Sequence, residues 1–357
     1  MFITDKTQLK QYETGTRTWQ GIPSVACTAK GRIFACWYSG KNTETFGNYS
    51  LLVKSDDGEN FSQPIAVAYM GEESRAYDSC LWIDPDGRLW YFWSVLPQKR
   101  VEFAVCENPD ATELEWSEIR TLGGDIMMNK PTVLKSGDWL FPVAVWKKGI
   151  FPAEWGQSER ETGAYAVASR DKGQTFEIRG KVDAENRNFD EHILLEKQNG
   201  DIEMFIRTFA GISAAVSKDG GYTFGKAEHL VSGPSSRFEI RRLSSGNIIM
   251  IYHRGTLSRN NLCAMLSEDD GVTFPHVLML DERNEVSYPD LWECNGKIYI
   301  IYDRERGAQY TPGKDYSGYA KEILLACITE RDIIEGKTVS PDSFLKRIVN
   351  KIPSAKK

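Results

Sequence analysis

The sequence predicts an all-β protein that folds as one six-bladed β-propeller. Three observations predict it. A short apolar strand motif built around a glycine recurs six times, a second motif of the form Ser-x-Asp-x-Gly-x-Thr-Phe recurs in phase with it, and long segments with a 3.6-residue apolar period are missing. The spacings of the first motif are 56, 50, 63, 46 and 50 residues, so six units nearly fill the 357 residues as a single domain.

The first motif has a polar residue or lysine, then glycine, one further residue and an apolar strand, as in NGKIYIIYD (295–303). Each copy is typical of a hairpin, in which an incoming strand reverses at the glycine and a second strand leaves. A two-domain α/β enzyme would need helices between these strands. The motif glycines are Gly31, Gly87, Gly137, Gly200, Gly246 and Gly296, and the expected blades cover 22–62, 78–117, 129–176, 190–224, 236–274 and 286–330.

The rest of the chain, 331–357, is expected to form short helices and a tail. The candidate helices are ERDIIEGK (330–337) and SPDSFLKRIVNKI (340–352), with the basic residues of the second on a solvated face.

The composition argues against several classes of binding partner. The net charge of −6, without a basic block, argues against nucleic acid, and no apolar stretch approaches the ~20 residues of a membrane span. The first residues contain no secretory signal, and the seven cysteines are scattered without a CxxC pair. We therefore expect a cytoplasmic protein with reduced thiols and with no metal, no cofactor and no membrane or nucleic-acid partner.

The second motif occurs at 169–176, 217–224 and 267–274, and a degraded copy at 54–61 has Lys54 in the place of serine. It is typical of a tight loop, in which the Ser and Asp side chains bond backbone N–H groups and the glycine takes a positive φ. These phrases resemble the Asp-boxes of the sialidase (neuraminidase) superfamily, and the resemblance covers nearly the whole chain. It implies a six-bladed propeller whose Asp-box loops are structural and lie on the face away from the active site.

The hairpin repeat also places the candidate site. If each incoming strand lines the central channel, its first residues lie at one mouth, and the second strand returns to the same mouth. Taken singly, Asp78, Asn129, Lys130 and Asp303 are better explained by solvation or a supporting role, but together these positions indicate a site. The mouth positions are Gln20, Gly21, Tyr77, Asp78, Asn129, Lys130, Glu191, His192, Arg237 and Tyr288 on the first strands, and Tyr38, Ser94, Arg207, His253 and Asp303 on the second.

The resemblance assigns roles to some of these residues. Retaining sialidases use a tyrosine nucleophile, whose proton a nearby glutamate accepts. SYPDL (287–291) is similar to the tyrosine strand, and FDEHILLEKQNGDIEMFIRT (189–208) is similar to the segment with the glutamate. Tyr288 is thus the candidate nucleophile and Glu191 the candidate base. The same resemblance makes Arg259 the third substrate-binding arginine and Glu44 a substitute for the acid.

Two arginine motifs of the superfamily are absent. GIPS has Gly21 where the family begins Arg-Ile-Pro, and FAGISAAVS (209–217) contains no arginine where the second is expected. Each charge-assisted contact to a sugar carboxylate contributes about 1.5–3 kcal/mol. We therefore predict that the protein is not a conventional sialidase, unless one of four other arginines compensates, namely Arg17, Arg207, Arg237 or Arg241.

The leading hypothesis is a sialidase-like exo-glycoside hydrolase that acts on a terminal sugar, acidic sugars included, of an oligosaccharide or glycoconjugate. One alternative is a polysaccharide lyase, in which Tyr288 or a histidine removes the proton α to a uronic acid carboxylate. Another is a glycan-binding propeller without catalysis. The candidate catalytic residues are Tyr288, Glu191, Glu44, Asp78 and His192, and the candidate substrate-binding residues are Arg259, Arg207, Arg237, Lys130, His253 and Tyr38.

Overall fold

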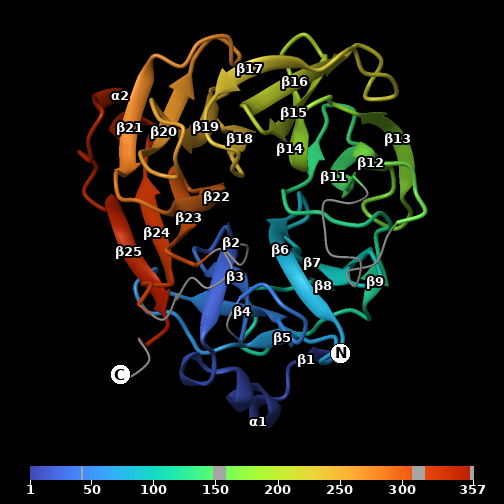
Figure 1. Cartoon of the computed structure of the whole chain (residues 1–357). Helices are drawn as coiled ribbons and strands as arrows, with labels where there is room; N and C mark the ends of the chain where they lie inside the picture. The colour runs from blue at the N-terminus through green and yellow to red at the C-terminus, as the bar shows by residue number, and fades with distance from the viewer. Residues whose placement is uncertain (42, 148–157, 308–317, 354–357) are drawn as a thin grey trace.

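The computed structural model describes residues 1–41, 43–147, 158–307 and 318–353, and it confirms the six-bladed propeller. Six antiparallel sheets stand in a ring around a central axis, as Figure 1 shows. In each sheet the first strand along the chain after the N-terminal segment is innermost, and the following strands step outward in order. Inner strands of neighbouring blades are in contact, as β2 is with β6 and with β22.

The first three blades use the N-terminal half of the chain. Two-residue strand β1 (Phe2–Ile3) pairs outside β5 and adds a fifth strand to blade 1. Between β1 and β2 lie α1 (Lys6–Leu9) and two 3₁₀ turns, η1 (Lys10–Tyr12) and η2 (Thr14–Thr16). The strands are β2 (Trp19–Cys27), β3 (Ile33–Gly40), β4 (Tyr49–Ser55) and β5 (Ala66–Ala68) in blade 1, β6 (Arg75–Ile83), β7 (Leu89–Leu96), β8 (Arg100–Cys106) and β9 (Arg120–Thr121) in blade 2, and β10 (Thr132–Val133), β11 (Trp139–Val145), β12 (Gly163–Ser169) and β13 (Glu177–Val182) in blade 3.

The last three blades follow the same plan, four consecutive strands each. They are β14 (Arg187–Glu196), β15 (Ile202–Thr208), β16 (Gly211–Ser217) and β17 (Glu228–Ser232) in blade 4, β18 (Glu239–Arg242), β19 (Ile248–His253), β20 (Leu262–Ser267) and β21 (His276–Asp281) in blade 5, and β22 (Val286–Cys294), β23 (Lys297–Arg304), β24 (Glu322–Ile328) and β25 (Phe344–Lys351) in blade 6.

The repeat glycines lie in the turns between the first and second strands, as predicted. All six have positive φ, for example 95° at Gly31 and 90° at Gly200, a conformation in which other side chains are strained. The face of the ring opposite these turns, where the inner strands begin, is the mouth.

The blade ends differ from the expected ranges. Each expected range ends before the fourth strand of its blade begins, as the range 129–176 ends before β13 at Glu177. In the four blades that contain the second motif, this motif is the loop between the third and fourth strands. The chain therefore needs further residues to return along the outer edge of each blade.

The prediction of a helix over 340–352 is wrong, since Phe344–Lys351 is strand β25. Its residues complete the outer edge of blade 6, where Ile348 pairs with Leu324 and Phe344 with Cys327. The short helix expected over 330–337 is present as α2 (Glu330–Glu335), which Thr329 caps and Gly336 ends in a left-handed conformation. The expected tail is described only as far as residue 353.

The loops of the second motif have the predicted geometry. In the copy at 217–224, Ser217 Oγ accepts from Gly221 N at 2.8 Å, and Asp219 accepts from Thr223 N at 2.9 Å. In the degraded copy the serine role belongs to Ser55, not to the Lys54 position, because Ser55 Oγ accepts from Gly58 N at 2.9 Å. Since strands alternate in direction, these loops lie on the face opposite the mouth.

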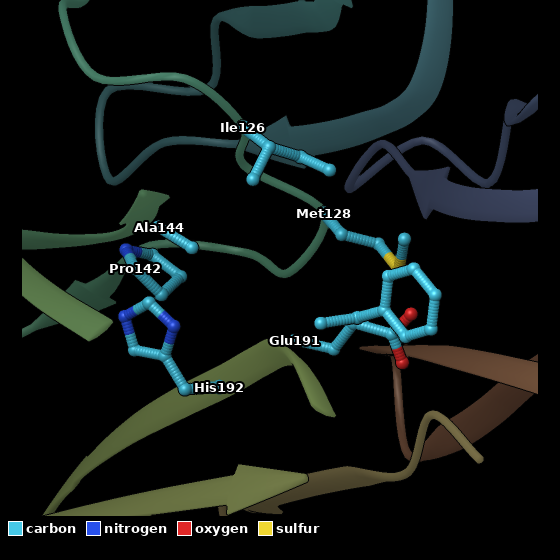
Figure 2. Close-up of a pocket in the computed structure, with 7 residues that line it drawn as sticks. Ile126, Met128, Pro142, Ala144, Glu191 and His192 are labelled. Carbon is cyan, nitrogen blue, oxygen red and sulfur yellow. The ribbon is translucent and has the colours of Figure 1, made fainter. Parts of the chain in front are cut away.

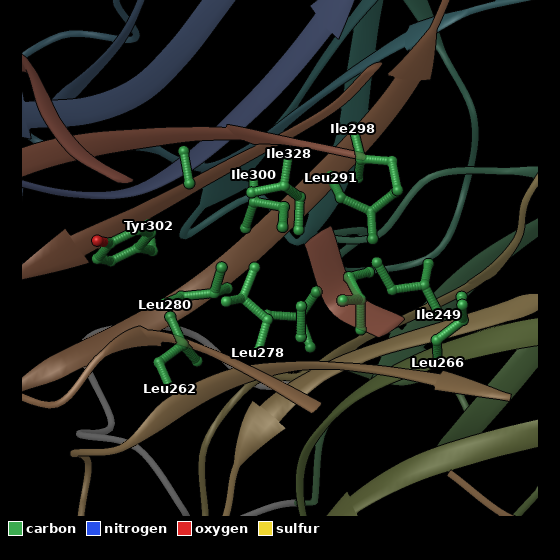
Figure 3. Packing of buried hydrophobic residues seen from close by; sticks show 14 of the residues in the cluster. Ile249, Leu262, Leu266, Leu278, Leu280, Leu291, Ile298, Ile300, Tyr302 and Ile328 are labelled. Carbon is green, nitrogen blue, oxygen red and sulfur yellow. The ribbon is translucent and has the colours of Figure 1, made fainter. Parts of the chain in front are cut away.

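Apolar side chains between neighbouring blades hold the ring together. Figure 3 shows one such layer, in which leucines and isoleucines of β19–β21 pack against residues of β22–β24. Leu262, Leu266 and Ile300 are completely buried there. Among the described residues, no helix is both long and apolar enough to cross a membrane.

Candidate active site

Four inner strands begin with the same irregularity at the mouth. The pairing of β2, β6, β14 and β22 with their neighbours shifts register there. The residue at the shift has a left-handed backbone, with φ of 59° at Ile22, 46° at Asp78, 43° at Glu191 and 55° at Tyr288. These bulge positions lie eight or nine residues before the repeat glycines. A bulge re-aims a side chain, and a left-handed non-glycine residue is strained, so both features are typical of functional positions.

Tyr288 and Glu191, from blades 6 and 4, meet across the mouth. The Tyr288 hydroxyl donates to Glu191 Oε1 at 3.1 Å. Both side chains are buried, with 6% of Tyr288 and 5% of Glu191 exposed. Burial and then the Glu191 charge raise the pKa of Tyr288, so the phenol is neutral and needs a base to become a nucleophile. Glu191 is in place to be that base.

Arg207, on β15, binds both members of this pair. Its Nη1 lies 2.6 Å from Glu191 Oε1 and donates to the Tyr288 hydroxyl at 3.1 Å. Its other nitrogens donate to Ser235, at 2.9 Å to the carbonyl and 3.2 Å to the hydroxyl. Burial opposes the charge on Arg207, but Glu191 and Tyr288 outweigh burial and raise the pKa of the guanidinium.

Two further arginines face the Tyr288 ring. The guanidinium carbon of Arg306 lies 4.3 Å from the ring centroid and that of Arg259 lies 5.4 Å from it. Arg259 donates from Nη2 to the Ser235 carbonyl at 3.1 Å, and Arg306 from Nη1 to Asp303 Oδ2 at 3.1 Å. Their other nitrogens donate no hydrogen bond to any described residue. With Arg207, they place three guanidiniums around one phenol.

Arg306 was not among the candidates, and its side chain lies against Gly21. A Cβ atom on Gly21 would lie 2.4 Å from Arg306 Cδ. The side chain of residue 306, after β23, therefore occupies the space that a side chain at position 21 would need. The family motif pointed to position 21, and Arg306 belongs to no repeat. Two features of the sequence could have suggested Arg306. One is the glycine at position 21, which leaves space for another side chain, and the other is the charged run RERG (304–307).

The two candidate acids are both near this group. Asp78 is buried at the bulge position of blade 2, with 4% exposed, and burial followed by the Glu44 charge raises its pKa well above the ordinary range. Glu44 Oε1 lies 3.4 Å from Arg306 Nε. The contacts thus make Glu44 an ion partner of Arg306, while the environment of Asp78 favours a protonated acid.

Aromatic residues of blades 1 to 3 line the other side of the mouth. Tyr38 is completely buried, and its ring lies 4.7 Å from Trp19 and 6.4 Å from Tyr77 between centroids. The hydroxyls of Tyr38 and Tyr77 are buried without a hydrogen-bond partner among the described residues. These rings share one apolar cluster with Tyr288. Tyr38 therefore belongs to the same buried cluster as the candidate nucleophile.

The two histidines do not join the Tyr288 group. His192 points away from Glu191, toward Pro142 and Ala144, as Figure 2 shows. Its Nε2 bonds the Tyr165 carbonyl at 2.8 Å, so this nitrogen carries the proton.

His253 bonds the Asn260 carbonyl through Nδ1 at 2.8 Å. Burial lowers the pKa of His192 and of His253 to about 4, so both are neutral near pH 7. The contacts give His192 no catalytic partner.

Lys130 and Arg237 belong to a second buried group, the channel cluster, with Glu239 and Asp290. Lys130 Nζ pairs with Asp290 Oδ2, and Arg237 Nη2 donates to Asp290 Oδ1 at 3.0 Å. All three nitrogens of Arg237 donate hydrogen bonds, and neither Lys130 nor Arg237 is more than 1% exposed. These contacts assign both residues to the support of the ring.

Of the four arginines named in the sequence analysis, Arg207 is the one that contacts Tyr288 and Glu191. Arg17 bonds the Tyr12 carbonyl and Asn350, and Arg241 lies 3.5 Å from Glu239, so neither contacts the Tyr288 group. The mouth cluster is therefore Glu191, Arg207, Arg259, Tyr288 and Arg306.

Solved structures with the same fold include several sialidases. The NanB sialidase of Streptococcus pneumoniae matches with a TM-score of 0.64 at 13% identity, over 84% of this chain and 67% of that chain. The intramolecular trans-sialidase of Ruminococcus gnavus, solved with oseltamivir carboxylate, matches with 0.64 at 12% identity, over 93% and 98%. A protein of unknown function from Dyadobacter fermentans matches with 0.62 at 18% identity, over 82% and 92%.

At such identities the structures establish the fold alone. A comparison with curated protein sequences finds no match. The model of the BNR repeat-like domain family matches residues 31–300, which is most of the chain. The chain therefore belongs to the BNR repeat-like family and is a sialidase-like six-bladed propeller.

Proposed function

We propose that the protein is an exo-glycoside hydrolase that releases a terminal, carboxylate-bearing sugar from a glycan. The observation that carries the proposal is the Tyr288–Glu191 hydrogen bond, enclosed by three guanidiniums. The N–H groups of Arg259 and Arg306 that donate no hydrogen bond to a described residue are the donors that a sugar carboxylate would need. An anion there would also relieve the repulsion between arginines, which adds to burial in lowering the pKa of Arg259.

The geometry supports a double displacement. Glu191 accepts the phenol proton while Tyr288 attacks the anomeric carbon, and Asp78 donates its proton to the leaving oxygen. A neutral tyrosine approaches an anionic sugar without the repulsion that a carboxylate would meet. In the second half, Asp78 accepts a proton from water, the water oxygen attacks the same carbon, and Glu191 returns its proton to the departing Tyr288.

The position of Arg306 bears on specificity. The third guanidinium comes from blade 6 and not from position 21 on blade 1, so a bound carboxylate would be held from a different direction than in the family pattern. We therefore expect an altered sugar specificity because of the position of Arg306, and not because the site has too few arginines. Comparable turnover of a sialoside and of other acidic glycosides would support it, and a strict preference for the sialoside would contradict it.

The test is a panel of aryl glycosides of acidic and neutral sugars, with product analysis. For the best substrate, Tyr288→Phe and Glu191→Gln should each lower kcat by at least ~100-fold, because nucleophile and base are lost. His253→Gln is the matched control at the mouth, and it should keep most of the turnover. Unchanged turnover in Tyr288→Phe would refute the mechanism.

The alternatives have less support from the contacts. In a lyase, the contacts count against His192, which bonds Tyr165, and against Lys130, which pairs with Asp290, so Tyr288 would have to be the base and Arg207 would have to neutralise the uronate. A product with the ultraviolet absorbance of an unsaturated uronide would favour the lyase. Glycan binding without product after long incubation would favour a propeller that only binds.

A further inference from the structure

The ring is closed between blades 1 and 6 by side chains. In the described part of the chain, each blade contains only strands from its own stretch of sequence, so no strand from one end of the chain enters the blade at the other end. The closing contacts include Ser24 Oγ to Asp290 Oδ2 at 2.7 Å and Trp292 Nε1 to the Cys27 carbonyl at 3.0 Å. Ring closure therefore depends on contacts without a shared sheet. We call this junction the seam.

Two cysteines meet at the seam. Cys27 ends β2 and Cys294 ends β22, the inner strands of the first and last blades, at the face opposite the mouth. Both thiols donate to the same carbonyl oxygen, that of Thr28, at 3.4 Å from Cys27 Sγ and 3.0 Å from Cys294 Sγ. Their sulfur atoms are thus neighbours, although 266 residues separate them in sequence.

The two thiols are not equivalent. Cys27 is buried, with 2% exposed, whereas Cys294 is partly exposed. The neighbouring Cys27 lowers the pKa of the Cys294 thiol, and Cys294 raises the pKa of Cys27. Because Cys294 is the more exposed of the two, it is the thiol that an external oxidant reaches first, and Cys27 is the resolving thiol beside it.

We propose that Cys27 and Cys294 form a reversible disulfide that locks the seam. With a low-molecular-weight disulfide as oxidant, the Cys294 thiolate attacks one of its sulfur atoms and releases the first small thiolate. The Cys27 sulfur, after losing its proton, then attacks the Cys294 sulfur of this mixed disulfide and releases the second. The protein loses two protons and two electrons, and the oxidant becomes two thiols.

The disulfide would join the two ends of the ring. It encloses nearly the whole sequence of blades, and a cross-link stabilises a protein more when the loop it closes is longer. We expect oxidation to raise Tm by about 5 °C or more. The pair lies on the face opposite the mouth, so a change in Tm can be measured separately from any change at Tyr288.

The experiment treats the full chain with oxidised glutathione, blocks free thiols by alkylation and maps tryptic peptides. The expected product links peptide 18–30, with Cys27, to peptide 284–297, with Cys294, and is lighter by two hydrogen atoms than the two reduced peptides together. Reduction should separate the peptides and reverse the rise in Tm. Absence of this linked pair would overturn the proposal, as would a link from either cysteine to peptide 322–331, which contains Cys327.

Variants separate the disulfide from other effects of oxidation. Cys294→Ala should abolish the link and the rise in Tm, while Cys263→Ala, which removes a buried thiol of blade 5 beside Met279, should keep both. A rise in Tm that persists in Cys294→Ala would also overturn the proposal. Because peptide mapping uses the natural sequence, its result stands even if Cys294→Ala folds poorly.

Discussion

The mouth cluster and the channel cluster are both buried groups of opposite charges, yet they differ in how many arginine nitrogens donate hydrogen bonds to the protein. In the channel cluster every nitrogen of Arg237 donates to a protein atom. In the mouth cluster, Arg259 and Arg306 each keep nitrogens without a hydrogen bond to a described residue. Charge and burial alone therefore do not distinguish a binding site from a structural support. The distinguishing feature is the presence of arginine N–H groups that donate no hydrogen bond to a described residue.

The largest expected effect is a loss of stability when the channel cluster is disrupted. Asp290→Ala leaves Lys130 and Arg237 buried without their carboxylate, and breaking a buried pair in this way costs about 3–5 kcal/mol of unfolding free energy. Chemical denaturation measures the loss. As control, Asp342→Ala removes the exposed partner of Lys297 and should leave the midpoint unchanged. An Asp290→Ala protein as stable as wild type would show that the channel cluster is not a support.

The next effect is expected at the mouth, on activity and not on stability. Arg306→Gln and Arg259→Gln each remove a charge-assisted contact to the substrate carboxylate, which contributes about 1.5–3 kcal/mol. We expect kcat/KM for an acidic glycoside to fall roughly ten- to hundredfold, with Tm within a few degrees of wild type. Equal losses on acidic and neutral glycosides would contradict a carboxylate-binding role.

Gly21 provides a control for the position of Arg306. Gly21→Ala places a Cβ 2.4 Å from Arg306 Cδ and must displace that side chain, so it should reproduce part of the Arg306→Gln loss. Gly15→Ala adds the same methyl group where no atom lies within 4 Å, and it should leave the kinetics unchanged.

The smallest expected effect is a pH dependence of stability that comes from Glu239 in the channel cluster. Burial raises the pKa of Glu239 in the channel cluster to about 7, above its ordinary value of 4.5. The folded state then binds more protons than the unfolded state between these values, so this group costs stability as pH rises from 4.5 to 7. Glu239→Gln should gain stability relative to wild type at pH 8 but not at pH 4.5. A difference between the two proteins that is constant with pH would contradict this assignment.

The fold could be predicted because its signals are local and repeated. A glycine turn and a serine–aspartate loop act through their own backbone, so each copy in the sequence reports one loop in the structure. Strand β25 could not be predicted in this way, since Phe344 and Ile348 become a strand only against the open edge of β24.

The site could be predicted only where a residue lies on the repeat. Tyr288, Glu191 and Arg207 occupy repeat positions, and the structure brings all three together. Lys130 and Arg237 also occupy such positions, and the sequence could not show that Asp290 would pair with both. Arg306 lies off the repeat and enters the mouth cluster through space left by Gly21, a steric relation that no spacing reveals.

The left-handed bulge has a consequence for how such a ring can change. Asp78, Glu191 and Tyr288 occupy one backbone position in three blades, while Ile22 holds it in a fourth. Each of these four blades thus directs one side chain toward the axis from the same kind of bulge, and each bulge depends on its own hairpin. We therefore expect that the residue at one bulge can be replaced without rebuilding the other blades.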